Sequence, residues 1–415
     1  MISSTRLDSG LHVVTERMPG SRSVTIGFWV DAGSRDEEPA VAGASHFLEH
    51  LLFKGTATRS AREIAEAVEA VGGDMNAFTT KEYTAFYTRL LDEDLDLGLD
   101  ILSDIMWAPA FRPEEIEAER QVIMEEILMH EDEPSDLVHD LFAEALYPGH
   151  PLGREVLGDK STIGAMGRDD IAGYFEALYK PGAIVVAAAG NVDHDRVVAG
   201  VQARYAGRPG ARPERTRPAL APARPLVVSN RSTEQAHVVV GTRALARDDD
   251  DRFALNVLNQ VLGGGMSSRL FQEIREKRGL VYSVYSYRAA YLESGSLAVY
   301  AGTSPSRVHE VLQLIDRELD RLVDEEVTDR ELAVAKGHVK GSLALSLEDS
   351  AGRMSRIGRS QLVHGSVMTF EELVARTEAV TRDDLRRVVD RVVAAERVLA
   401  VVGPFAEEHF SARVA

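Results

Sequence analysis

The sequence predicts an α+β protein of two homologous halves, each a mostly antiparallel sheet covered by helices on one face. Its 415 residues suit two domains of about 200 residues each. Residues 207–225 include five prolines and two glycines, a composition typical of an extended linker. Strand-like and helix-like segments follow one another in the same order before and after that linker. We therefore place domains at 1–208 and 226–415, joined by a linker at 209–225.

Apolar runs predict the strands, and periodic apolar residues between capping signals predict the helices. In the first half we expect a strand at 23–30, a helix over 46–50, a helix from 60 that ends at 72–73, strands at 75–80 and 83–90, and helices at 95–106 and 113–129. In the second half we expect a strand at 236–242, a helix ending at 262–265, a helix at 268–277, strands at 281–287 and 295–301, and helices at 306–322 and 329–345.

Composition restricts the class of protein. The net charge of −19, from 47 basic and 66 acidic residues, argues against nucleic-acid binding. This charge favours either solubility alone or attraction of basic peptides. The N-terminus lacks the apolar core of a signal peptide, and no apolar run is long enough to span a bilayer. We therefore expect a cytoplasmic protein with no membrane partner.

The most informative motif is His46-Phe47-Leu48-Glu49-His50. Two histidines four apart on a helix lie on one face and can hold one metal ion, and Glu49 lies on nearly the same face as His46. Because the chain has no cysteine, any metal site must use histidine and carboxylate ligands, which favours a catalytic zinc over a structural one. The spacing is the inverted zincin order. A chance match on an amphipathic helix is the alternative.

A third ligand should come from another helix and should be a carboxylate. Glu119 and Glu126 are seven residues apart on the predicted helix 113–129, so they share a face. On spacing alone, a solvated acidic helix face is the competing interpretation.

The motif and its continuation to Thr56 resemble the pitrilysin-type metallopeptidases, which include insulin-degrading enzyme and the mitochondrial processing peptidase. The likeness extends to residues 72–79, 119–126 and 263–285, and it is particularly to the catalytic β subunit of the mitochondrial enzyme and its bacterial relatives. The resemblance implies one zinc per chain with a fixed ligand set: His46, His50 and Glu126. Glu49 would be the general base and Glu119 an auxiliary acidic residue near the site. Glu125 is the rival third ligand, but it should point about 100° away around the helix.

The same resemblance suggests substrate contacts. Asn76 and Ala77 match an edge strand to which a peptide adds as a further strand, with an ordinary hairpin strand as the alternative. Phe53 matches the residue of the hydrophobic pocket after the scissile bond, or else it is a core phenylalanine. Asp136 and Asp140 fall where the mitochondrial enzyme holds a presequence arginine, although the family pattern there is Glu then Asp. A solvated charged face would also explain this pair.

Arg275 and Tyr282 resemble the family pair that completes the active site from the opposite half of the clamshell. Tyr282 would hydrogen-bond the developing oxyanion, and Arg275 would bind the substrate backbone. Because this chain is about half the length of the fused family members, the resemblance implies a half-clamshell and a homodimer. In that dimer the pair of one chain would serve the zinc of its partner. A heterodimer with a paralogous chain is the alternative.

The sequence therefore predicts a zinc-dependent endopeptidase of the inverzincin type. It would cleave short or unfolded, basic peptides in a closed dimer cavity by Glu-assisted attack of zinc-bound water. Two alternatives stay open: a noncatalytic scaffold or partner subunit of the same fold, and a maturase for one specific precursor peptide. The peptidase and maturase interpretations require intact ligands, and the scaffold does not.

Overall fold

The computed structural model describes residues 1–207 and 209–413 and divides into two compact units. The first unit comprises Met1–Leu128, Glu155–Thr216 and Leu345–Met368, and the second comprises Met129–Arg154, Arg217–Ala344 and Thr369–Ala415. The units follow the two halves of the sequence except for two exchanged segments. Residues 129–154 belong to the second unit, and residues 345–368 belong to the first. The boundaries predicted at 1–208 and 226–415 differ from the units by these segments, and the predicted linker at 209–225 is divided between the units after Thr216.

The first unit contains a six-stranded sheet in the order β1-β2-β6-β3-β5-β4. Its strands, in that order, are Ile2–Arg6, His12–Arg17, Ile184–Gly190, Ser23–Val30, Thr84–Leu91 and Asp74–Thr79. Neighbouring strands are antiparallel except β2 and β6, which run parallel. β4 is therefore an edge strand of this sheet, and among the described residues no strand pairs with its outer side.

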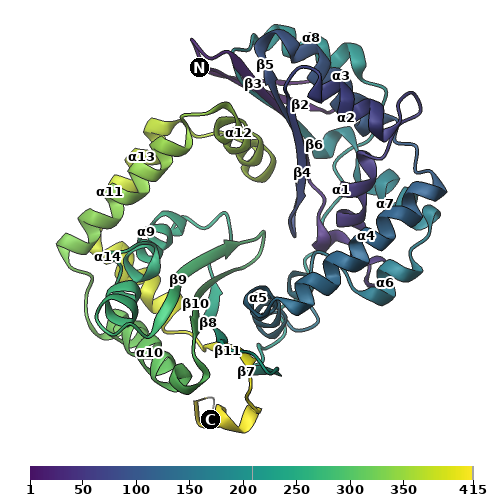
Figure 1. Cartoon of the computed structure of the whole chain (residues 1–415). Helices are drawn as coiled ribbons and strands as arrows, with labels where there is room; N and C mark the ends of the chain where they lie inside the picture. Colours follow the sequence, from purple (N-terminus) through teal and green to yellow (C-terminus); the bar gives the residue numbers. More distant parts are fainter. Residues whose placement is uncertain (208, 414–415) are drawn as a thin grey trace. The chain divides into compact units, whose positions relative to one another are not determined.

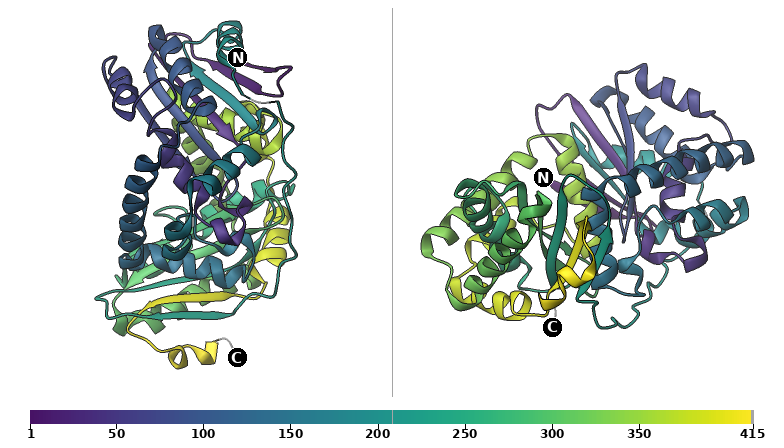
Figure 2. Two further views of the ribbon diagram at one scale, coloured as in Figure 1. Left: turned by 90° about the vertical axis from the view of Figure 1, so that its right-hand side faces the viewer. Right: turned by 60° about the horizontal axis from the view of Figure 1, so that its bottom comes forward.

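The second unit contains a five-stranded sheet in the order β7-β11-β8-β10-β9. Its strands, in that order, are Leu226–Asn230, Val398–Gly403, Ala236–Ala244, Gly295–Thr303 and Val281–Ala290. Only β7 and β11 are parallel, and the yellow β11 lies beside the teal β7 in Figure 2. When β1 is set aside and the five remaining strands of each sheet are ranked along the chain, both sheets have the same order in space: first, last, second, fourth, third. The shared topology confirms the predicted pair of similar α+β halves.

In the first unit, a hydrophobic core lies between the sheet and a layer of helices (Figure 1). The helices that contribute to this core are α1 (Ala44–Leu52), α2 (Ala61–Glu69), α3 (Leu95–Trp107), α4 (Pro113–Asp132), α6 (Lys160–Ala165), α7 (Arg168–Leu178) and α8 (His194–Arg204). Ile26 and Phe28 of β3 point into this core, whereas Trp29 points to the opposite face, as strand alternation requires. On that opposite face Trp29 packs against α12 (Ser350–His364), which lies over β6 and β3.

The second unit repeats this arrangement. One face of its sheet is covered by helices from the second half of the sequence. They are α9 (Arg252–Gly263), the π-helical segment η6 (Phe271–Glu276), α10 (Val308–Asp324), α11 (Asp329–Ser346), α14 (Arg382–Val388) and η8 (Val389–Val393). Helix α13 (Phe370–Glu378) contacts α9. The opposite face is covered by α5 (Pro134–Leu146), whose Val138 and Phe142 pack against Val239 and Ala400.

The prediction that helices cover one face of each sheet is therefore incomplete. Each sheet carries an apolar second face that one helix of an exchanged segment covers. The physical reason is visible in β6 and β11, which are buried along their whole length and are apolar on both sides. Within the described residues, no helix is both long enough and apolar enough to span a bilayer.

Candidate functional site

Helix α1 presents the histidine motif on one side. It begins after Gly43, whose φ of 94° lies in the left-handed region that favours glycine. The apolar side of the helix is buried through Phe47, Leu48, Leu51 and Leu52. His46, Glu49 and His50 lie on the other side and are partly exposed, as the i, i+3 and i+4 spacing requires.

The structure brings Glu126 of α4 to the two histidines. The Glu126 Oε2 lies 3.6 Å from His46 Nε2 and 3.5 Å from His50 Nε2. Ligand atoms on a tetrahedral zinc with bonds of about 2.0–2.2 Å would lie about 3.3–3.6 Å apart, so both distances from Glu126 fit a shared zinc ion. Glu125 is exposed and is not part of this cluster, so the structure favours Glu126 over its neighbour.

Glu119 supports this cluster from behind. Its carboxylate is buried, and one oxygen lies 3.0 Å from His50 Nδ1 while the other lies 2.8 Å from Lys54 Nζ. If Nδ1 of His50 carries the ring proton and donates a hydrogen bond to Glu119, the Nε2 of His50 remains free to bind a metal. The positive charge of Lys54 compensates the buried carboxylate of Glu119.

Burial shifts the pKa values of two residues of the motif, His46 and Glu49. Burial, together with the charge of His50, lowers the pKa of His46 to about 4, so its imidazole is neutral at pH 7. Burial raises the pKa of Glu49 above its ordinary value, against hydrogen bonds from the hydroxyl and backbone N–H of Thr79 and the charge of His50. A glutamate with a raised pKa is a stronger base once ionised.

The edge strand β4 carries the predicted substrate contacts of the first unit. Asn76 is exposed, and its Oδ1 accepts a hydrogen bond of 2.8 Å from the N–H of Ala77. At the end of the same strand, Thr79 reaches Glu49, so β4 and the motif helix are directly connected. Phe53 is half-buried, and its ring centroid lies 5.9 Å from that of the buried Phe86. This placement agrees with both interpretations of Phe53.

The remaining predicted residues lie in the second unit. The Arg275 guanidinium lies over the ring of Tyr282, 5.5 Å from its centroid, and Tyr282 is 82% exposed. The structure therefore brings this predicted pair together at the end of η6 and the start of β9. Asp136 and Asp140 do lie on a helix, α5, but Asp140 contacts the imidazole of His130 while Asp136 is exposed. Asp136 is thus the more accessible of the two carboxylates.

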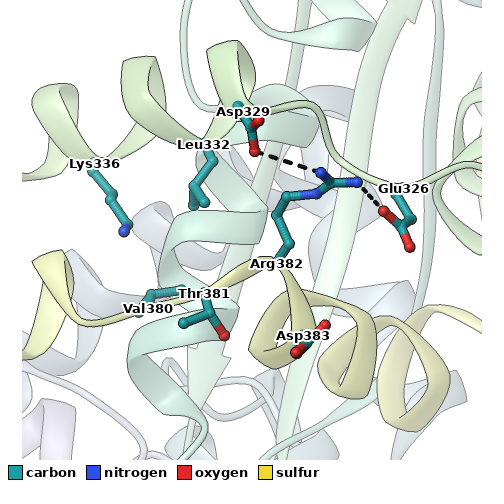
Figure 3. Close-up of a pocket in the computed structure, with 8 residues that line it drawn as sticks. All are labelled: Glu326, Asp329, Leu332, Lys336, Val380, Thr381, Arg382 and Asp383. Carbon is teal, nitrogen blue, oxygen red and sulfur yellow. Dashed lines mark hydrogen bonds and ion pairs between the residues drawn. The ribbon is translucent and has the colours of Figure 1, made fainter.

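A separate pocket of about 470 Å³ lies in the second unit between α11 and the start of α14 (Figure 3). Its Arg382 is paired with Glu326 and lies 3.5 Å from Asp329. Its Lys336 donates a hydrogen bond to the carbonyl oxygen of Glu378. Because both cations are engaged within the protein, we assign this pocket no ligand.

Sequence reasoning missed two residues of the site. Lys54 lies in the turn just after the end of α1, so its closeness to His50 in the sequence was a signal of its place near the ligands, although helical spacing does not fix it. Thr79 gives no such signal, because only the packing of β4 beside α1 brings its hydroxyl to Glu49.

Comparison with known proteins shows two family matches. Residues 12–160 match the family described as "Insulinase (Peptidase family M16)", and residues 165–338 match "Peptidase M16 inactive domain". A protein of Streptomyces coelicolor called an uncharacterized zinc protease is 47% identical over 99% of this chain and 91% of its own length. The uncharacterized zinc protease YmxG of Bacillus subtilis is 39% identical, with coverage of 97% and 98%.

Solved structures show the same fold. A protease from Helicobacter pylori superimposes with a TM-score of 0.90 at 23% identity, covering 97% of this chain and 100% of that one. A Pseudomonas fluorescens structure described as a peptidase M16 inactive domain gives the same TM-score at 21% identity, with 98% of each chain covered.

Proposed function

The chain belongs to the insulinase family of peptidases, peptidase family M16, and from this premise we propose that it is a zinc-dependent endopeptidase for short or unfolded, basic peptides. The observation that carries the proposal is the meeting of His46, His50 and Glu126 around one point beside Glu49. The relatives' description as zinc proteases supports the metal. We propose a cytoplasmic location as well.

Each residue of the site would have a distinct role in peptide hydrolysis. A zinc ion held by His46, His50 and Glu126 would supply a Lewis acid that activates water and polarises the peptide carbonyl. Glu49 takes a proton from the attacking water and passes it to the leaving amine, with its raised pKa suited to both transfers. Glu119 and Lys54 hold His50 in one orientation and tautomer.

Substrate would bind by adding a strand to the open edge of β4. Backbone hydrogen bonds to the segment around Asn76 and Ala77 would supply affinity with little dependence on sequence. The net charge of −19 would favour basic peptides, and the exposed carboxylate of Asp136 is one candidate to receive an arginine or lysine.

The test is hydrolysis of two quenched fluorescent peptides of equal length, one basic and one acidic, by zinc-loaded protein. We expect cleavage of both, with the larger kcat/KM for the basic peptide. Bound zinc without cleavage of either peptide would favour a noncatalytic scaffold. Cleavage of one precursor from a broad panel, and of nothing else, would favour a maturase.

The acid limb of the pH–rate profile should respond to Thr79. The hydrogen bond from the Thr79 hydroxyl lowers the pKa of Glu49, so Thr79→Val, which removes that hydroxyl and keeps the backbone N–H, should raise the pKa and move the acid limb to higher pH. Glu49 must be ionised to act as a base, so the variant should lose activity first at low pH and regain it as pH rises. The profile of kcat/KM against pH measures this. An unmoved limb would mean that another group controls it.

We also propose that the enzyme works as a homodimer in which Arg275 and Tyr282 of one chain serve the metal site of its partner. Glu49→Gln and Tyr282→Phe chains should each be nearly inactive alone. Mixed dimers would contain one intact site, so random mixing should restore about a quarter of the wild-type rate in a two-fold dimer. Failure to restore any activity would contradict sites that are shared between two copies of the chain.

A further inference from the structure

The loop that leads into the metal-binding helix carries an unusual density of buried charge. It joins β3 to α1, and its side chains Asp31, Arg35 and Glu37 are all buried. Asp36, between them, is nearly buried, with 10% of its side chain exposed. Three carboxylates in this short stretch need partners, because a buried charge without one is strongly unfavourable.

Glu37 links this loop to the first turn of α1. One of its oxygens accepts a hydrogen bond of 2.8 Å from the N–H of Gly43, and the other accepts one of 2.8 Å from the N–H of Ser45. The Ser45 hydroxyl in turn lies 2.7 Å from the Tyr174 hydroxyl, which donates to the carbonyl oxygen of Gly33. Glu37 therefore fixes the start of α1, and His46 directly follows the Ser45 that Glu37 holds.

The partner for the other two carboxylates comes from the Pro-rich segment. Arg215 makes a bidentate pair with Asp36, with both N···O distances 2.7 Å, and its third nitrogen lies 3.3 Å from Asp31. Arg215 is itself 7% exposed. The preceding Arg212 also pairs with Asp31. This part of the predicted linker is thus docked on the first unit, to which residues up to Thr216 belong.

Arg215 also reaches the turn between β4 and β5. It donates a hydrogen bond of 2.7 Å to the carbonyl oxygen of Glu82, whose side chain pairs with Arg35 at 2.5 Å. Gly33 permits the loop to approach this turn, because a Cβ there would lie 2.3 Å from the carbonyl oxygen of Thr80. Arg215 therefore contacts the loop before α1 and the turn after β4, the strand whose Thr79 bonds Glu49.

We propose that Arg215 is a positioning residue for the metal site. It clamps the β3–α1 loop and the β4–β5 turn together, so that Glu37 can hold the start of α1 and thereby the direction of His46 and His50. The proposal extends the proposed function, on whose metal site it rests. It gives the Pro-rich segment a role in metal binding, beyond that of joining two domains.

The test compares two arginines of the first unit whose side chains are 7% and 11% exposed. Arg215→Gln removes the clamp, whereas Arg356→Gln removes a matched ion pair to the buried Glu16, formed through α12 on the other face of the sheet. For each protein we would measure the zinc Kd by chelator competition, the visible absorption of the cobalt(II)-loaded form, and the Tm without metal. Arg215→Gln should lower the zinc affinity by about 10–100-fold, which is the usual cost of losing a residue that supports a metal ligand. It should also alter the cobalt spectrum. Arg356→Gln should lower the Tm and leave zinc affinity and the cobalt spectrum unchanged.

Equal zinc affinity in wild type and Arg215→Gln, or equal losses in both variants, would overturn the proposal. If Arg215→Gln does not fold, Arg215→Lys takes its place, because lysine keeps the charge but cannot form the bidentate pair. This variant should still lower the zinc affinity more than Arg356→Gln does. The readout also separates this proposal from the proposed function. A wild type that binds zinc but cleaves no peptide contradicts the endopeptidase, while the zinc affinities of the variants still decide the role of Arg215.

Discussion

Replacing Glu49 by glutamine should abolish peptide hydrolysis while leaving zinc bound. Glutamine keeps the size of the side chain but cannot take a proton, so kcat should fall by about 10²–10⁴-fold, the range typical for loss of a general base. The three metal-ligand groups are unchanged, so the variant should hold as much zinc as the wild type. Turnover of a fluorogenic peptide and zinc analysis of the same preparation measure both quantities.

The control for this variant is Glu125→Gln, which makes the same chemical change at an exposed glutamate outside the cluster. It should retain full activity. A Glu49→Gln protein with near-normal turnover would show that another group accepts the proton. A Glu49→Gln protein without zinc would instead assign Glu49 to metal binding.

The second large effect is expected at Glu126. Its carboxylate is the single anionic group that faces both histidine Nε2 atoms within the described cluster. Glu126→Gln replaces it by a neutral amide, so zinc affinity should fall by more than the 10–100-fold that loss of an outer-shell partner costs. Activity should return in part at high zinc concentration.

Chelator competition measures the zinc affinity of Glu126→Gln, with Glu125→Gln again as the matched control on the adjacent residue. Far-ultraviolet circular dichroism should show that both variants keep their helix content. Tight zinc binding by Glu126→Gln would contradict its role as a ligand, and loss of zinc in Glu125→Gln would point to the neighbour instead.

The motif helix could be predicted from sequence because its information is local. The four-residue spacing of His46 and His50 places both on one face of α1 whatever the rest of the chain does. The third ligand is different, since spacing leaves both Glu119 and Glu126 as candidates. Only the packing of α4 beside α1 separates them, with Glu126 at the Nε2 atoms and Glu119 at the Nδ1 atom of His50.

The fold shows the same division between local and distant information. The predicted strands at 75–80 and 83–90 and the predicted helices at 95–106 and 113–129 lie within a few residues of β4, β5, α3 and α4. The exchanged helices α5 and α12 carry no local signal of the sheet they cover. The Pro-rich segment forms no helix or strand in its described residues, as its composition predicts, but the docking of Arg215 depends on carboxylates far away in the sequence.

If one zinc ion per chain, held by His46, His50 and Glu126, makes this protein a peptidase, its activity must depend on bound zinc. The most direct measurement titrates zinc into metal-free protein while recording hydrolysis of the basic peptide and zinc bound per chain. Activity should be absent at the start, rise in proportion to bound zinc and stop rising at one equivalent per chain. Hydrolysis by metal-free protein, or one equivalent of bound zinc with no hydrolysis of any peptide tested, would rule out a zinc-dependent peptidase.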